Sequence, residues 1–242
     1  MNTQYPQQRT GSFSVPHRTE AVSGIERVFM QKVYGWMAGG LALSASTAVG
    51  IAVVPDVQAV IFNSTILLFG LIIGQFILVG ALSGWVHRMS SGTAMMCFVG
   101  YAVLTGITLS TVFLVFSTAS VVNIFLVSSA MFGGMSVFGM VTRRDLSSWG
   151  SFFFMGLVGI VLAGVVNIFL NSSMMSFVIS VVAVFVFTGL TAYDTQNIKE
   201  MAVLEAHDGA LASNYAILGA LTLYLDFINL FLALLRLFGD RD

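Results

Sequence analysis

The chain has 242 residues, of which 57% are hydrophobic and 9% charged, and its mean hydropathy is +0.92. A water-soluble domain cannot bury so many apolar side chains, so the composition indicates a membrane protein with several spanning helices. The formal net charge of −1 gives no basis for nucleic-acid binding, and we expect none. The single cysteine, Cys97, excludes a disulfide framework and a thiolate metal cluster.

Residues 1–24 are polar and contain no apolar core, so they do not resemble a signal peptide. We expect them to form a disordered cytoplasmic tail. The rest of the chain, 25–242, is predicted to be one membrane domain.

Seven apolar windows are long enough to cross a bilayer as helices. They cover 29–54, 60–86, 94–116, 121–141, 149–170, 174–198 and 213–238. The junctions between them are too short to hold a separate domain. The sequence therefore predicts an all-α polytopic membrane protein with seven transmembrane helices.

Glycines four residues apart recur in the first two predicted spans. The pairs are Gly35 and Gly39, Gly70 and Gly74, and Gly80 and Gly84. Pairs of small residues at this spacing let two helix backbones approach closely in a membrane. They predict close helix packing at these positions and say nothing of function.

Basic residues indicate the orientation, because cytoplasmic loops carry an excess of Lys and Arg. Eight of the ten precede the first span or follow the second, fourth and sixth, namely Arg9, Arg18, Arg27, Lys32, Arg88, Arg143, Arg144 and Lys199. This predicts a cytoplasmic N-terminus and, with seven spans, a C-terminus outside. Arg236 and Arg241 lie at the other end and leave an alternative open, in which a re-entrant last segment returns the C-terminus to the cytoplasm.

Two acidic residues lie inside apolar spans, Asp194 in the sixth and Asp226 in the seventh. A carboxylate in hydrocarbon costs several kcal/mol, so such residues tend to face the interior of the bundle and to mark a site. Steps of four and three residues from Asp226 connect it with Thr222 and Asn229 on one polar stripe. Capping or hydrogen bonding of a neighbouring helix end remains the alternative role, more so for Asp194.

Two carboxyl groups on adjacent helices can share one proton, because like charges a few ångströms apart do not both ionise at low cost. The pair would then switch between a neutral hydrogen-bonded state and an anionic site for a hard cation such as Ca²⁺. Thr191, Thr195, Thr222 and Asn229 are candidates to add neutral oxygens. Arg88, at the end of the second span, is a candidate to hold the anionic form closed, and its alternative role is that of a cytoplasmic anchor.

The last two spans resemble the Bax inhibitor-1 family, and its bacterial inner-membrane branch in particular. The resemblance rests on TGLTAYDTQNIKEM (188–201) and YAILGALTLYLDFINLFLALLRLFG (215–239), and YGWMAGGL (34–41) fits it as well. It implies a central last helix wrapped by two three-helix layers, in the bacterial inner membrane. It also implies a pH-sensitive Ca²⁺ leak governed by paired aspartates, which correspond here to Asp194 and Asp226.

One position departs from the family pattern. Many members have an acid midway along the second span, and the matching residue here is Gln75. This substitution removes one oxyanion for a cation and one partner for a basic latch. The sequence therefore supports proton sharing by the two aspartates more strongly than it supports ion conduction.

Three functions are compatible with this sequence. The first is a cation leak channel gated by proton sharing, with Ca²⁺ as the permeant ion, no cofactor and no enzymatic activity. The second is a non-conducting regulator that binds a protease, a translocon or a stress-pathway partner in the bilayer. The third is an intramembrane aspartyl protease. Presenilin-like enzymes, however, have Gly two residues before the second Asp, where this chain has Tyr224, and a Pro-Ala-Leu segment that is absent here.

Overall fold

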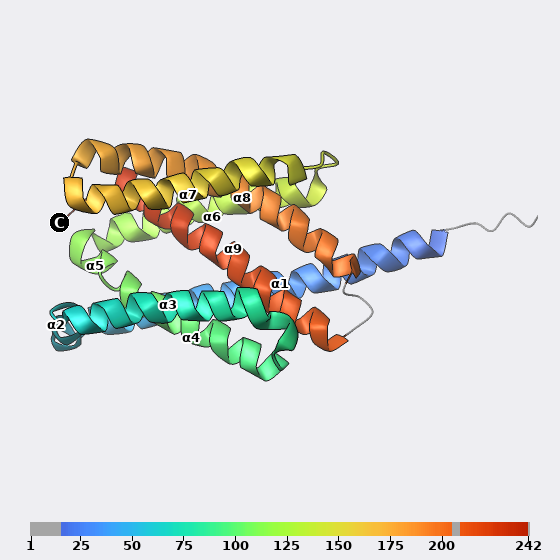
Figure 1. Ribbon diagram of the computed structural model, residues 1–242, viewed down its shortest axis with the longest axis horizontal. Coiled ribbons are helices and arrows are strands. Elements are labelled where there is room, and N and C mark those ends of the chain that lie inside the picture. The colour runs from blue at the N-terminus through green and yellow to red at the C-terminus, as the bar shows by residue number, and fades with distance from the viewer. Residues whose placement is uncertain (1–15, 205–208, 242) are drawn as a thin grey trace, which may run out of the picture.

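The computed structural model describes residues 16–204 and 209–241, and within them the chain forms seven helices that are long and apolar enough to cross a bilayer (Figure 1). They are α1 (Pro16–Ala52), α3 (Thr65–Trp85), α4 (Ser91–Leu109), α6 (Thr118–Val141), α7 (Ser147–Leu170), α8 (Ser173–Leu204) and α9 (Gly209–Phe238). The predicted all-α architecture with seven spans is confirmed.

Short helices fill three of the junctions: α2 (Pro55–Phe62), η1 (Val86–Arg88) and α5 (Val112–Val115). Serine hydroxyls mark the starts of three spans, because each accepts a hydrogen bond from a backbone N–H of the first turn. Ser64 caps α3, Ser90 caps α4 and Ser117 caps α6.

The boundary of the N-terminal tail differs from the prediction. α1 begins at Pro16, so the last part of the predicted tail, 16–24, is helical. Proline suits the first position of a helix, because its missing N–H has no partner there in any case. Residues 1–15 lie outside the described part of the chain, and the prediction of disorder is not tested there.

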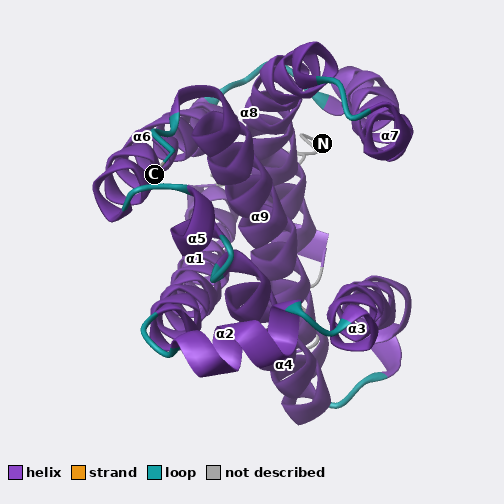
Figure 2. Cartoon of the chain, turned by 90° about the vertical axis from the view of Figure 1, so that its left-hand side faces the viewer, coloured by secondary structure: helices purple, strands orange, loops and turns teal. Residues whose placement is uncertain are grey.

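α9 runs through the middle of the bundle between two layers of three helices (Figure 2). One layer has the order α1–α4–α3 and the other has the order α6–α8–α7, so the third span of each triplet lies between the other two. In the most apolar window of α9, 72% of the residues are buried, against none in that of α7. The expected central last helix wrapped by two three-helix layers is therefore confirmed.

The helices approach most closely at glycines other than the predicted pairs. At Gly35, Gly39, Gly70, Gly80 and Gly84 an added Cβ would meet nothing within 4 Å, so the packing prediction is wrong there. A Cβ at Gly106 of α4 would lie 2.6 Å from the carbonyl oxygen of Ser44 on α1. A Cβ at Gly139 of α6 would overlap the carbonyl oxygen of Ala192 on α8.

The described ends of the chain lie at opposite ends of the bundle (Figure 1). α9 is one continuous helix, which contradicts the alternative of a re-entrant last segment. At the end where α1 starts, Lys199 Nζ lies 3.7 Å from a carboxylate oxygen of Glu26 and donates a hydrogen bond to the carbonyl of Met140. The placement of this end in the cytoplasm stays a prediction.

Candidate functional site

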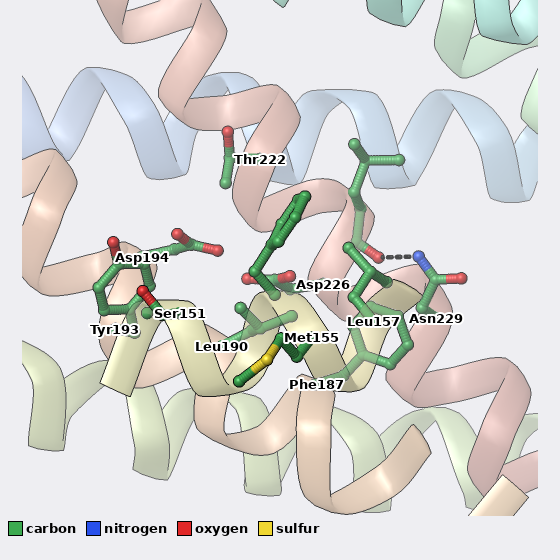
Figure 3. A pocket seen from close by; sticks show the side chains of 13 residues that line it. Ser151, Met155, Leu157, Phe187, Leu190, Tyr193, Asp194, Thr222, Asp226 and Asn229 are labelled. Atoms are coloured by element: carbon green, nitrogen blue, oxygen red, sulfur yellow. Dashed lines mark hydrogen bonds between the residues drawn. The ribbon is translucent and has the colours of Figure 1, made fainter. Parts of the chain in front are cut away.

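Asp194 and Asp226 line one cavity of about 640 Å³ between α7, α8 and α9 (Figure 3). Asp194 lies on α8 and is half-buried, whereas Asp226 lies midway along α9 and is only 4% exposed. Both acids therefore face protein, as expected for carboxyl groups inside a membrane bundle.

The carboxyl groups of Asp194 and Asp226 are neighbours in this cavity (Figure 3). Two ionised carboxylates contain no donor, so a hydrogen bond between them requires that one carries a proton. Oδ2 of Asp226 is buried without a hydrogen-bond partner among the described residues. A hydrogen bond between α8 and α9 through these two acids therefore needs a proton on at least one of them.

On α9, neutral polar side chains lie one helical turn before and one turn after Asp226. Thr222 lies one turn before Asp226 and donates its hydroxyl to the carbonyl of Leu218 over 3.2 Å. Asn229 lies one turn after it and donates Nδ2 to the carbonyl of Leu225 over 2.8 Å. Both line the cavity, as the predicted polar stripe requires.

The structure places four of the predicted supporting residues elsewhere. Thr191 is fully buried and donates to the carbonyl of Phe187, and the hydroxyl of Thr195 lies 3.1 Å from that of Ser136 on α6. Gln75 donates to the hydroxyl of Thr108 on α4, in the opposite layer. Arg88 is exposed in η1 and forms no ion pair with a described residue, so it does not latch the pair in this conformation.

α7 supplies a wall of the cavity that the sequence did not indicate. Ser151, Met155 and Leu157 line it, and Met155 is 65% exposed because α7 lies at the edge of its layer. A Cβ at Gly150 would lie 2.5 Å from the hydroxyl oxygen of Tyr193, so this glycine lets α7 approach the residue next to Asp194. Ser151 is the only polar member of this wall apart from the backbone, and an all-apolar helix gives no signal of which face turns inward.

The loop between α6 and α7 is fastened to α8 directly after Asp194. Gln196 accepts a hydrogen bond from the N–H of Leu146 over 2.8 Å and donates one to the carbonyl of Arg144 over 3.0 Å. This amide therefore holds the loop against the part of α8 that carries Asp194. Nothing in the sequence pattern distinguished Gln196 from the other polar residues near the end of the sixth span.

The donor set does not match a resident calcium site. In the described part of the chain, no three His, Cys, Asp or Glu side chains come together. A bound Ca²⁺ takes about six to eight oxygen ligands, which two carboxylates and a few neutral groups do not supply.

Comparison with known proteins supports the resemblance in the last two spans. The family model described as Inhibitor of apoptosis-promoting Bax1 matches residues 26–242. The inner membrane protein YbhL of Escherichia coli is 47% identical over 216 residues, which are 89% of this chain and 92% of that protein. An uncharacterised protein of Borreliella burgdorferi is 43% identical over 217 residues, with 90% and 94% of the two chains covered. This multi-pass membrane protein therefore belongs to the Bax inhibitor-1 family.

Proposed function

We propose that the protein is a pH-sensitive cation leak channel with Ca²⁺ as the permeant ion, gated by the proton that Asp194 and Asp226 share. The observation that carries this proposal is the approach of the two carboxyl groups inside a cavity between α8 and α9. A hydrogen bond between them needs a proton on at least one carboxyl group and is lost when both ionise, so a change of pH changes the contact between two packed helices.

The mechanism follows from the charge on the pair. With one proton present, the hydrogen bond joins α8 to α9, and the pair has one negative charge. Loss of that proton removes the bond and places two like charges together, which repel each other and attract a divalent cation. Thr222 and Asn229 lie beside the path of such an ion and offer it neutral oxygens. The proposal includes no enzymatic step and no cofactor.

Flux into liposomes across a pH series tests the gate. The purified protein is reconstituted with a Ca²⁺-sensitive dye inside, and wild type is compared with Asp226→Asn and Asp194→Asn. An amide keeps a donor at every pH, so each variant is expected to lose the pH dependence of the flux. Asp56→Asn is the matched control, since Asp56 is an exposed acid in the first turn of α2, away from the pair, and should leave the profile unchanged.

Two results would contradict the proposal. Absence of flux for the folded wild type would favour the non-conducting regulator. If both Asn variants kept the wild-type pH profile of the flux, the acidic pair would not control conduction.

We further propose a bacterial inner-membrane location with the N-terminus in the cytoplasm. The printed name of the Escherichia coli relative and the basic residues near the start of α1 support this orientation. A reporter that fluoresces only in the cytoplasm, fused to the C-terminus, should stay dark, whereas bright cells would reverse the orientation.

A further inference from the structure

A second cavity, of about 780 Å³, lies at the end of the bundle where α7 turns into α8. Arg236 and Arg241 both line it. These are the two basic residues that depart from the orientation pattern of the other eight. Both arginines depart from the excess of basic residues at the cytoplasmic side, and both line the same cavity. We infer that they have a role in this cavity.

The protein holds both arginines in position. Arg236 lies in the last turn of α9. Beyond this helix, the N–H of Asp240 donates to the hydroxyl of Ser120 over 2.9 Å, and its carbonyl accepts from the N–H of Ser117 over 3.1 Å. This fastened segment places the guanidinium of Arg241 over the ring of Phe116, 5.8 Å from its centroid.

The α7–α8 turn contributes polar lining residues that hydrogen bonds hold in place. Asn167 donates Nδ2 to the hydroxyl of Ser176 over 2.7 Å and accepts a hydrogen bond from the N–H of Ser172 over 3.1 Å. Asn171, with φ of 48°, ends α7 in the left-handed conformation that makes this tight turn. Hydroxyl and amide side chains therefore line the cavity together with the two arginines.

The arginines have no carboxylate partner among the described residues. Asp240 contributes backbone hydrogen bonds here, and Asp242 lies outside the described part of the chain. A cation at the end of α9 also interacts with the helix dipole, which accounts for Arg236 alone. The dipole explains neither Arg241 nor the shared cavity.

We propose that this cavity binds the phosphate of an anionic phospholipid, in the leaflet opposite the basic loops. Guanidinium groups bind phosphate through paired, charge-assisted hydrogen bonds. The lining also includes Ile168 and Phe177, which are 77% and 55% exposed, so acyl chains have an apolar surface beside the headgroup. A soluble phosphate would use the guanidinium groups but not this surface, and the lipid is therefore the better match.

Binding to the purified full chain in detergent tests the proposal. The probe is dihexanoylphosphatidylglycerol, compared with dihexanoylphosphatidylcholine and with inorganic phosphate. We expect phosphatidylglycerol to bind most tightly. The double variant Arg236→Gln/Arg241→Gln should bind it at least about tenfold more weakly, because charged hydrogen bonds are lost. Arg143→Gln/Arg144→Gln, a pair of exposed arginines at the other end, is the matched control and should bind as wild type does.

Equal binding of the lipid by the wild type and the folded double variant would overturn the site. Equal binding of inorganic phosphate would overturn the lipid assignment. Because the double variant could unfold, the wild type is also tested in liposomes with a photoreactive phosphatidylglycerol. Crosslinks at the α7–α8 turn would support the site, and crosslinks confined to the end with Arg143 would contradict it.

Discussion

Asp194 and Asp226 meet between α8 and α9, although a carboxyl group is among the costliest side chains to bury in a membrane bundle. Oδ2 of Asp226 is buried without a hydrogen-bond partner among the described residues, which adds to the cost of burying this carboxyl group. Burial of the two acids therefore destabilises the protein, so we infer that they serve its function and not its stability. Removal of the Asp226 carboxyl group should therefore change stability and activity in opposite directions.

Asp226→Leu should keep or raise the thermal stability of the protein and abolish its pH-dependent flux. Leucine branches at Cγ as aspartate does and removes the cost of desolvation, and replacements of buried ionic groups by apolar ones are often neutral or stabilising by about 1–4 kcal/mol. Thermal unfolding in detergent measures the first effect and the liposome assay the second. Marked destabilisation by Asp226→Leu would show that the acid is structural.

Asn214→Leu, on the same helix, is the contrasting variant. Asn214 is 2% exposed and donates to the carbonyls of Val86 and Met89, over 3.1 and 2.8 Å, which holds the α3–α4 connection against α9. Its loss removes a donor from both carbonyls, of which that of Val86 still accepts from the N–H of Met89, and should destabilise the protein by about 1–3 kcal/mol. If both leucine variants had the same stability, buried polar residues of α9 could not be divided into functional and structural ones.

The seven spans were predictable because length and hydropathy alone define them. The direction in which each helix face points was harder to predict, as α8 shows. Thr191 and Thr195 are four residues apart and share a face, whereas Asp194 is turned from Thr195 by about 100°. Thr195 therefore meets α6 while Asp194 meets α9, and the sequence had grouped the three together.

The closest helix approaches were missed for a related reason. Glycines occur throughout the apolar spans, and the spacing of the predicted pairs did not reveal which ones face a neighbour. Gly139 and Gly150 have no partner at the expected spacing of four residues, yet they lie against α8. Only the packing of the layers identifies them, because α7 is apolar on nearly every face.

Gly139→Ala should destabilise the protein by about 1–3 kcal/mol, as other overpacked cores do. The new Cβ would overlap the backbone carbonyl of Ala192, and a backbone atom cannot move aside without moving α8. Gly134→Ala on the same helix is the control, since its Cβ would meet nothing within 4 Å and alanine favours the helix. The two variants are compared by thermal or denaturant unfolding, and equal stability would contradict the close approach of α6 and α8.

Gln196→Ala should loosen the α6–α7 loop while leaving the bundle folded. Both of its hydrogen bonds to the loop would be lost, so amide hydrogen exchange over 142–147 should become about tenfold faster or more. Glu200→Ala, an exposed residue further along α8, is the control. Unchanged exchange in the Gln196 variant would mean that the loop is held by other contacts.

The start of α7 should weaken in acid. The hydroxyl and the N–H of Ser147 both donate to Asp145 and lower the pKa of its carboxyl below the ordinary value. The folded pKa lies below the unfolded one, so this contribution is complete above the unfolded pKa and is lost as pH falls through the folded pKa. Hydrogen exchange at the first turn of α7, corrected for its intrinsic rate, should rise toward low pH in the wild type and lose this dependence in Asp145→Asn. If hydrogen exchange in Asp145→Asn still depended on pH, another titratable group would be responsible.

Gly150→Ala should change the flux with little effect on stability, because its clash is with a side chain that can move. The new Cβ would lie 2.5 Å from the end of the Tyr193 ring, which must shift within the cavity beside Asp194. Gly159→Ala, on the same helix, is the control, since its Cβ would meet nothing within 4 Å.

The readouts are the pH midpoint of Ca²⁺ flux and the thermal unfolding temperature. Gly150→Ala should move the midpoint, Gly159→Ala should not, and the unfolding temperatures of both should stay close to that of the wild type. Adding Tyr193→Ala to Gly150→Ala removes the clash. A midpoint of this double variant that still differs from the wild type then reflects the loss of the Tyr193 ring alone. If Gly150→Ala retained the wild-type midpoint, the wall that α7 contributes would have no part in the gate, and the pair would act through α8 and α9 only.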